Sequence, residues 1–283
     1  MKRILALLCI ITYNVFAQTD QPKLVLGIVV DQMRYDYINR YWDDFSEGGF
    51  KQLVTKGYNC TNTHYNFIPT YTGPGHASIY TGATPSSHGI IANSWFNRST
   101  EKYNYCVSDS TMNTVGADNA SGKMSPSKML NTTFGDELRL FSMNRSKVIG
   151  VALKDRSAVL PAGHMGNNAF WLDSETGDFV SSSFYGAKLP KWAQRFNQKN
   201  LCETYLSQKW DLLLDSSAYD ESLADNSAYE AVFTGEDAPV FPHDLPMLTQ
   251  TNGKGIIKST PFGNSLTKDM AIAAIKGAQL GED

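Results

Sequence analysis

The sequence predicts an α/β fold in which helices cover both faces of a mostly parallel sheet. Two apolar runs support this prediction, residues 24–30 (LVLGIVV) and 147–153 (KVIGVAL). Unbroken aliphatic and β-branched runs of this length are typical of strands that are buried on both faces. Segments with helical spacing lie between and beyond these runs, and such alternation is typical of a parallel sheet sandwiched by helices.

The remaining elements are expected from periodicity and from capping residues. Residues 35–57 have helical spacing that breaks near Gly48 and Gly49, and residues 58–65 are read as a second strand. Thr133 and Asp136 form a capping pattern at the start of a helix that runs to about residue 143. A clean amphipathic helix is expected over residues 267–280.

The chain divides into two expected parts. Residues 1–17 have a charged start, an apolar stretch and a small residue at Ala17, which is typical of a secretory signal peptide. Residues 18–283 form one domain, in which the aromatic- and Ser-rich range 158–261 is expected to be an irregular insertion or cap. We therefore expect an exported protein, periplasmic or extracellular, and no other segment is apolar and long enough to cross a membrane.

The net charge bears on possible binding partners, and the cysteines bear on disulfides and metal sites. Removing residues 1–17 takes away Lys2 and Arg3 and changes the formal net charge from −3 to −5. An acidic chain without a basic run argues against nucleic acid as a partner. Outside the signal peptide, Cys60, Cys106 and Cys202 allow one disulfide and one free thiol, and their spacing matches no metal site.

The segment around Thr72 is the most informative part of the sequence. Thr72 is followed by Gly73, Pro74 and Gly75 and then by a helix-like stretch. Proline suits a first helical turn, and the free N–H groups of a helix N-terminus favour an anion. Thr72 is therefore either a hydroxyl placed beside a bound phosphate or a residue of an ordinary Gly/Pro turn.

Three further positions lie where ligands gather, at or near the carboxyl ends of expected strands. Asp31 follows the first apolar run and is either a metal ligand or a helix cap. Lys154 and Arg156 end the run 147–153 and could hold phosphoryl oxygens, or form part of a charged surface. Asn93 could donate its amide to a phosphoryl oxygen or be a turn residue.

Together these segments resemble the alkaline phosphatase superfamily. The match is nearest to bacterial alkaline phosphatases that use a threonine nucleophile and are related to nucleotide pyrophosphatases/phosphodiesterases. It runs from about Leu24 to the end of the chain. The motifs are Asp31, TGPGHAS at 72–78, TG at 81–82, HGI at 88–90, Asn93, KDR at 154–156, PAGH at 161–164 and TPFGN at 260–264.

The resemblance implies an alkaline-phosphatase-like fold and the hydrolysis of small-molecule phosphate monoesters at a site with two Zn²⁺ ions. Thr72 would be a metal-bound nucleophile that forms a phosphothreonine, and Asp31 would be a zinc ligand. Asn93, Lys154 and Arg156 would bind the substrate and stabilise charge in the transition state. A cation makes a hydroxyl competent near neutral pH, which agrees with this mechanism.

The sequence departs from the family in its metal ligands. The family completes its zinc site with an Asp-x-x-x-His motif, an adjacent Asp-His pair and a later His, and none of these occurs here. His76 and His88 are expected to be structural hydrogen-bonding residues, and the pair His243-Asp244 is a weak metal candidate. We therefore expect a fragment whose fold is incomplete at the C-terminus.

Three alternatives to a monoesterase follow from the same residues. A phosphodiesterase or nucleotide pyrophosphatase would need an apolar pocket for its second ester group in place of the Lys154/Arg156 pair. A sulfatase fits less well, because Thr72 cannot become formylglycine and His76 replaces the required arginine. A non-catalytic exported protein is expected if the chain ends at residue 283.

Overall fold

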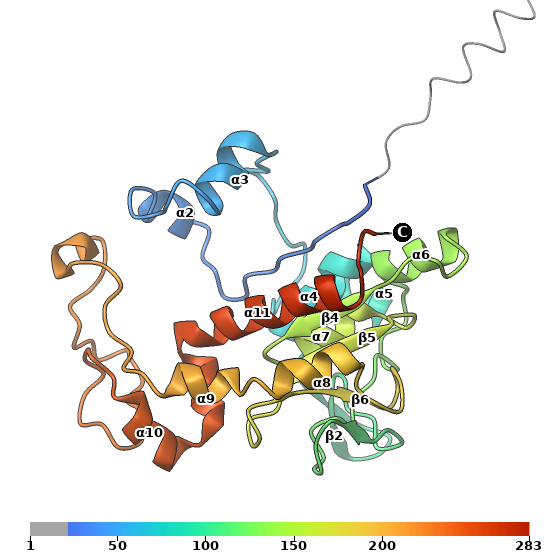
Figure 1. The fold of residues 1–283 in the computed structure, drawn as a ribbon. Helices are drawn as coiled ribbons and strands as arrows, with labels where there is room; N and C mark the ends of the chain where they lie inside the picture. Colours follow the sequence, from blue (N-terminus) through green and yellow to red (C-terminus); the bar gives the residue numbers. More distant parts are fainter. Residues whose placement is uncertain (1–21, 283) are drawn as a thin grey trace, which may run out of the picture.

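The computed structural model describes residues 22–282 and places a four-stranded mixed sheet at the centre of the molecule (Figure 1). The strand order is β3-β6-β5-β4, with bounds Thr114–Val115, Phe179–Ser182, Asn168–Leu172 and Ile149–Ala152. β4 and β5 are parallel, whereas β6 is antiparallel to both β5 and β3. The pairing is more mixed than expected because a short turn joins β5 to β6, and such a turn permits only antiparallel neighbours.

Helices cover both faces of this sheet, which confirms the α/β sandwich. α7 (Asp155–Ala162) packs on β4 and β5, and it is backed by α4 (Thr72–Thr81) and α6 (Phe134–Phe141). α11 (Pro261–Gly277) packs on β4 and against α8 (Lys191–Asn197). The other helices are α2 (Tyr37–Arg40), α3 (Phe50–Lys56), α5 (Pro85–His88), α9 (Leu201–Leu206), α10 (Leu245–Asn252) and the 3₁₀ helices η1 (Ser216–Tyr219) and η2 (Lys254–Ser259).

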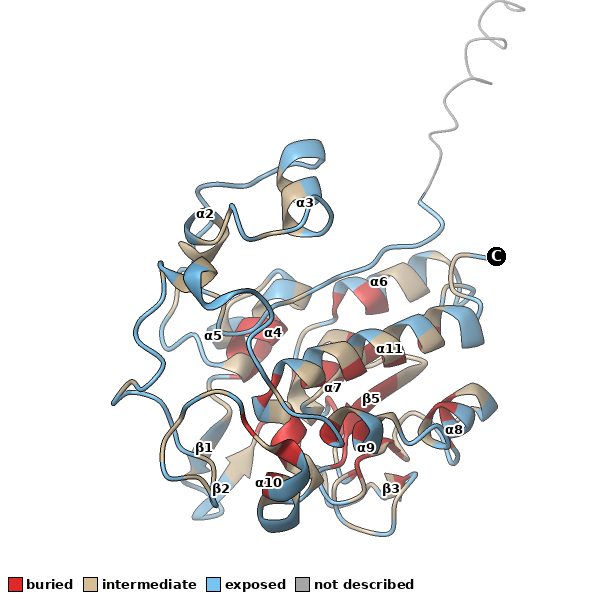
Figure 2. Cartoon of the chain, turned by 60° about the vertical axis from the view of Figure 1, so that its left-hand side comes forward, coloured by how far each residue is buried: buried red, intermediate tan, exposed pale blue. Residues whose placement is uncertain are grey.

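Strand β5 divides the core into two clusters, because successive side chains of a strand point to opposite faces. Phe170 and Leu172 belong to a cluster with residues of α8 to α11. Ala169 and Trp171 belong to a second cluster with residues of α4 and α7. All four side chains are buried, as Figure 2 shows for this strand, so β5 is apolar without interruption and not by alternation.

The first apolar run differs from its prediction. Residues 24–30 join no sheet among the described residues, and most of their side chains are exposed. Residues 58–65 also form no strand and are exposed. Residues 35–57 form the short helices α2 and α3, with the expected break before Gly49. The signal peptide predicted for residues 1–17 lies outside the described residues.

The later elements follow the sequence more closely. Residues 147–153 contain β4, and the predicted C-terminal helix is α11, which begins earlier than expected, at Pro261. The range 158–261 needs correction, because residues 168–182 supply two strands of the central sheet. The aromatic residues Phe170 and Phe179 mark core strands here and not a surface cap. Most of residues 211–244 is irregular, as expected.

Two findings bear on the remaining expectations. Cys60, Cys106 and Cys202 are all free thiols, so the disulfide allowed by the sequence does not form. Within residues 22–282, no helix combines the length and the apolar character needed to cross a bilayer.

A buried carboxylate joins α6 to the end of α7. Asp136 and Thr133 form the predicted capping box, and Asp136 also accepts hydrogen bonds from the backbone N–H groups of His164 and Met165. Gly163 makes this junction possible, with φ +71° and ψ −163°. A Cβ atom at Gly163 would lie 2.5 Å from Asp136 Oδ2 and closer still to Thr133 Oγ1. Asp136 thereby stabilises the chain that follows α7.

We expect Gly163→Ala to lower the free energy of unfolding by about 3 kcal/mol, the sum of backbone strain and overpacking. Gly253→Ala is the matched control, since Gly253 also ends a helix, has φ +70° and ψ 179°, and has open space around its Cα. Gly253→Ala should lower the free energy of unfolding by the backbone strain alone, about 1–2 kcal/mol. Urea denaturation measures both variants. Equal losses would contradict the account of the Asp136 junction.

Candidate active site

The first residue of α4 presents the candidate nucleophile. Thr72 is half-buried and opens the helix, one position further into it than the sequence suggested, and Tyr71 is the N-cap. Its Oγ1 donates a hydrogen bond to Asp31 Oδ2 at 2.9 Å. Asp31 is exposed and follows the run 24–30, and its other oxygen accepts the N–H of Gln32 at 3.0 Å. The structure thus brings together two residues that lie far apart in the sequence.

Asn93 secures the start of the same helix. Its Oδ1 accepts the Gly73 N–H at 2.7 Å, and its carbonyl oxygen accepts the Cys106 N–H at 2.9 Å. Asn93 lies directly before β1 (Ser94–Asn97), which pairs with β2 (Lys102–Tyr105) in a two-stranded ribbon. Because Oδ1 is occupied, Nδ2 is the group that Asn93 can offer to a ligand. The structure therefore places the Asn93 side chain beside Thr72, at the start of α4.

Two cations lie at the start of α7, which packs against α4. Lys154 is the N-cap residue of α7, and its side chain is exposed. Arg156 is half-buried, and its Nη1 donates to the Tyr105 hydroxyl at 3.0 Å. The Nε of Arg156 is buried and has no acceptor among the described residues. Both cations come directly after β4, as the sequence predicted, so two positive charges share one edge of the sheet.

Tyr105 holds the Arg156 side chain, and Asp155 in turn holds Tyr105, although the sequence singled out neither residue. The Tyr105 hydroxyl donates to Asp155 Oδ1 at 2.5 Å and accepts from Arg156. Burial, and secondarily the neighbouring Asp155 charge, raises the pKa of Tyr105, so the phenol keeps its proton. Asp155 lies between Lys154 and Arg156 in the sequence. No local signal in the sequence places Tyr105 beside it.

Cys106 lies close to the nucleophile without competing with it. A Cβ atom at Gly73 would lie 3.4 Å from the Cys106 Sγ. Burial, and then the Asp155 charge, raises the pKa of this thiol to about 12. The thiolate is the nucleophilic form of cysteine, so Cys106 stays inert near neutral pH. Cys106 is also fully buried, whereas Thr72 is only half-buried, so the Thr72 hydroxyl is the more accessible of the two groups.

Two buried histidines support α4, as expected. His76 Nδ1 lies 2.9 Å from the Thr72 carbonyl oxygen, which can only accept, so Nδ1 carries the proton. His88 accepts the Ile90 N–H at Nδ1, and its Nε2 therefore donates to Ser78 Oγ at 2.9 Å. Burial lowers the pKa of both imidazoles, which keeps them neutral in the folded protein. Both histidines thus form hydrogen bonds to residues of α4, Thr72 and Ser78.

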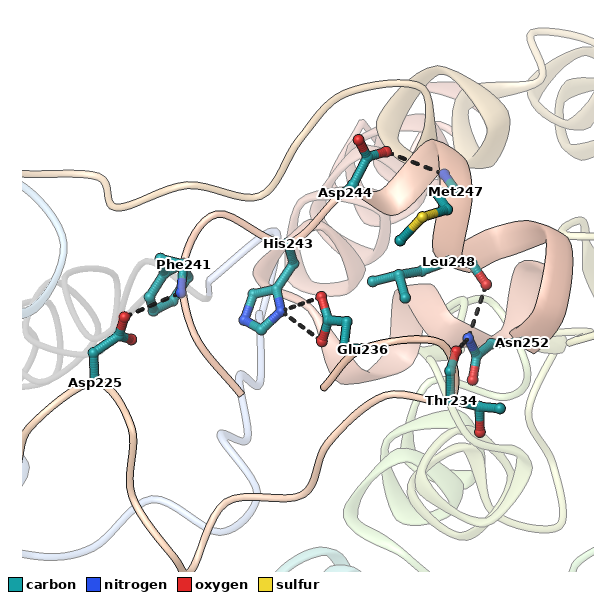
Figure 3. Close-up of polar contacts among 9 residues, drawn as sticks. All are labelled: Asp225, Thr234, Glu236, Phe241, His243, Asp244, Met247, Leu248 and Asn252. Carbon is teal, nitrogen blue, oxygen red and sulfur yellow. Dashed lines mark hydrogen bonds and ion pairs between the residues drawn. The ribbon is translucent and has the colours of Figure 1, made fainter. Parts of the chain in front are cut away.

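His243 and Asp244 each make polar contacts within this part of the chain, as Figure 3 shows. His243 Nδ1 contacts both carboxylate oxygens of Glu236, at 2.9 and 3.0 Å, and its ring lies among Trp210, Phe233 and Phe241. Asp244 caps α10 by accepting the Met247 N–H at 3.1 Å.

The described residues do not make a complete zinc site. Zinc in proteins takes about four ligands from His, Cys and carboxylate side chains, or three and a water. Asp31 and Thr72 offer two oxygen atoms 2.9 Å apart. Across residues 22–282, no group of three or more His, Cys, Asp or Glu side chains is arranged to hold a metal ion. Asp31 and Thr72 could therefore supply two oxygen ligands, which is fewer than such a site needs.

The chain is similar to known proteins over most of its length. The profile of the type I phosphodiesterase/nucleotide pyrophosphatase family matches residues 25–248. A Myroides odoratus protein named calcium-transporting ATPase is 44% identical over 282 residues, which are 99% of this chain and 52% of that protein. The alkaline phosphatase PafA of Elizabethkingia meningoseptica is 45% identical over 264 residues, which are 93% of this chain and 48% of that enzyme.

Solved structures of PafA share the fold of this chain. The crystal structure of the wild type enzyme superposes with a TM-score of 0.91 at 45% identity and covers 94% of this chain and 51% of that one. A crystal structure of a PafA mutant with a threonine, an asparagine, a lysine and an arginine substituted also gives a TM-score of 0.91, at 44% identity, and covers 94% of this chain and 52% of that one. The chain spans about half the length of the relatives it matches.

The neutral histidines predict a stability that falls in acid. His76 and His88 have lowered pKa values when folded, so below the ordinary value of 6.5 the unfolded chain binds more protons than the folded one. Their contribution is complete above pH 6.5 and is lost as the pH falls towards their folded pKa values. The free energy of unfolding, measured from pH 8 to pH 5, should have a smaller slope in His88→Asn than in the parent chain. An unchanged slope would contradict the assignment.

We expect Tyr105→Phe to lower the free energy of unfolding by about 1–3 kcal/mol, because it leaves Asp155 and Arg156 without the hydroxyl that joins them. Tyr103→Phe is the matched control on the same strand, since the Tyr103 side chain is 77% exposed. Its effect should stay within about 0.5 kcal/mol. Chemical denaturation compares the two variants, and equal effects would refute the role given to Tyr105.

Proposed function

Since the chain belongs to the type I phosphodiesterase/nucleotide pyrophosphatase family, we propose that it forms part of a hydrolase that cleaves phosphate monoesters, with Thr72 as the nucleophile. The observation that carries this proposal is the hydrogen bond from Thr72 Oγ1 to Asp31 at the N-terminus of α4. That bond holds a hydroxyl in one orientation where a helix end favours an anion.

The proposed reaction has two steps. Thr72 Oγ1 loses its proton and bonds to phosphorus while the ester P–O bond breaks, and the leaving alcohol takes up a proton. Water then attacks the phosphothreonine, which restores the Thr72 hydroxyl and releases inorganic phosphate. Asn93 Nδ2, Lys154 and Arg156 would donate to the phosphoryl oxygens, where charge must be stabilised in the transition state.

The charge of the site favours a monoester over a diester. A monoester is a dianion near neutral pH, whereas a diester is a monoanion, so the former gains more from two adjacent cations. Lys154 and Arg156 supply these charges at the start of α7, and Tyr105 holds the guanidinium in place. The family description keeps a phosphodiesterase or nucleotide pyrophosphatase as the second candidate.

The relatives support the same chemistry and the same residues. An ATPase and an alkaline phosphatase, as two relatives are named, both transfer a terminal phosphoryl group to water. The threonine and the asparagine substituted in the PafA mutant are as many positions apart as Thr72 and Asn93. The substituted lysine and arginine are spaced as Lys154 and Arg156 are.

Two Zn²⁺ ions complete the proposal. Asp31 and Thr72 would hold one side of the metal site, and the missing ligands would come from polypeptide that the relatives possess beyond the matched half. A bound cation would lower the pKa of the Thr72 hydroxyl and neutralise part of the substrate charge. We further propose that the protein is exported, because residues 1–17 have the pattern of a signal peptide.

A hybrid enzyme tests the nucleophile. Residues 1–283 are joined to the part of PafA that this chain does not cover, and phosphate release from an aryl phosphate is measured with zinc present. Thr72→Val should lower kcat/KM by at least about a thousandfold, as removal of a nucleophile does. Thr72→Ser should retain much of the activity. Thr70→Val removes an exposed hydroxyl two residues upstream and is the control. A folded, zinc-loaded parent hybrid without activity, or an active Thr72→Val variant, would refute the proposal.

Lys154→Ala in the same hybrid separates the two candidate functions. For a monoesterase, kcat/KM for an aryl monoester should fall about ten- to a hundredfold, the effect of losing one charge-assisted hydrogen bond. The rate with the matching diester should change much less. Lys188→Ala removes another exposed lysine and is the control. A parent hybrid that prefers the diester, with both rates equally affected by the variant, would favour the phosphodiesterase.

A further inference from the structure

A cavity of about 580 Å³ lies where residues 230–243 meet Trp210 and the end of η2. Its walls are mostly apolar, and the largest side chains on them are the rings of Trp210, Phe233 and Phe241. None of the residues that we propose for catalysis lines this cavity. Cavities of this size that are lined by aromatic side chains and a few polar groups are typical binding sites for small molecules.

His243 lines the cavity with one ring nitrogen unused. Its side chain is 7% exposed, and its Nδ1 contacts both oxygens of the Glu236 carboxylate, at 2.9 and 3.0 Å. Because a carboxylate only accepts, Nδ1 carries the proton and Nε2 of the neutral ring carries a lone pair. Nε2 lies on the side of the ring that faces away from Glu236 (Figure 3), and it has no hydrogen-bond partner within residues 22–282. Such a nitrogen is suited to accept a hydrogen bond from a ligand.

The direction of this nitrogen is fixed by the surrounding residues. The backbones of Trp210 and His243 exchange two hydrogen bonds, of 3.0 and 2.9 Å, and the two rings lie 4.8 Å apart. Phe233 and Phe241 pack against the same imidazole edge to face. A histidine that serves only structure gains from bonding both nitrogens, as the buried His88 does. The open nitrogen of His243 therefore points to a ligand.

The charge at the cavity is negative. Among the described residues, its lining contains the exposed carboxylate of Glu230 and no lysine or arginine. A second carboxylate, that of Glu236, lies behind the imidazole and is 11% exposed. An anionic ligand is therefore disfavoured. A cation gains from the carboxylates and from the electron-rich faces of the aromatic rings.

We propose that this cavity binds a small organic cation that carries an ammonium N–H group on an apolar body. The N–H group would donate to His243 Nε2, and Glu230 would balance the charge of the ligand. The apolar body would lie against Trp210, Phe233 and Phe241. A quaternary ammonium lacks the hydrogen-bond donor, and a neutral alcohol lacks the charge, so both should fit less well.

Four probes that share one phenyl ring test the charge and the donor. They are phenethylammonium, its N,N,N-trimethyl derivative, 2-phenylethanol and 3-phenylpropionate, each titrated into the purified chain by calorimetry at about pH 8, where a primary amine keeps its proton. Phenethylammonium should bind at least about tenfold more tightly than each of the other three, because each lacks the charge or the donor.

Glu230→Gln should weaken the binding of phenethylammonium about tenfold, because it removes the charge that balances the ligand. Glu101→Gln is the matched control, since Glu101 is also an exposed glutamate and does not line the cavity. Both positions are exposed, so neither variant should change the Tm. Nitrogen NMR of the chain labelled in its histidine rings locates the probe. The Nε2 signal of His243, identified by its contacts to the Trp210 ring, should shift on binding, whereas the signals of His88 should not.

Several results would overturn the proposal. These are no saturable binding of phenethylammonium up to about 10 mM, equal affinity for any of the other three probes, equal effects of Glu230→Gln and Glu101→Gln, and an Nε2 signal that does not move. Tighter binding of a methyl glucoside than of the amine would also contradict it and would identify the aromatic walls as a sugar site. Thr72→Val should bind phenethylammonium as the parent chain does, so a failure here leaves the proposed hydrolysis unaffected.

Discussion

The hydrogen bond from the Gly73 amide to the Asn93 side chain fixes the position from which the rest of the site is built. It joins the first turn of α4 to the residue before β1 at 2.7 Å. A Cβ atom at Gly73 would lie 3.2 Å from both Asn93 Oδ1 and the Ala92 carbonyl oxygen, so only glycine lets the two segments approach without adjustment. Thr72 precedes this glycine, and its hydroxyl direction is then set by Asp31.

The position of the Arg156 guanidinium depends on a polar network that lies next to the hydrogen bond between Gly73 and Asn93. Cys106 connects the Asn93 carbonyl to the end of β2, where Tyr105 meets Asp155 and Arg156. Arg156 is thus held by a protonated phenol that also satisfies a carboxylate, whereas Lys154 remains exposed and free of such constraint. In the proposed reaction, the fixed guanidinium would orient a phosphoryl group and the exposed ammonium would neutralise part of its charge.

Local patterns in the sequence predicted the parts of this structure that depend on neighbouring residues. The capping box of α6 was predicted from Thr133 and Asp136, and the structure confirms it. Strand β4, which Lys154 and Arg156 follow, was predicted from the apolar run 147–153. The proximity of Thr72 and Asp31 was inferred from family resemblance, because nothing in the spacing of two distant residues reveals a contact. Tyr105 was missed for the same reason. Strands β5 and β6 were not predicted. Their aromatic and polar residues become buried only when the strands pair in the folded sheet, and the sequence does not show that pairing.

Residues 24–30 were predicted to form a strand, but they join no sheet among the described residues. Their composition is that of a strand buried on both faces, yet they are exposed and unpaired among residues 22–282. The composition of a strand reflects all the neighbours that it has in its sheet, so a run of this kind is read as a strand even though no sheet among the described residues includes it.

The account depends most directly on the identity of the atom that attacks phosphorus. The zinc-loaded hybrid of this chain and PafA, mixed with an aryl phosphate and quenched in acid during turnover, would be digested and analysed by mass spectrometry. The account predicts a phosphoryl group on Thr72 that disappears once the substrate is exhausted. Continued release of phosphate with every peptide containing Thr72 unmodified, or with the phosphoryl group on another residue, would contradict it.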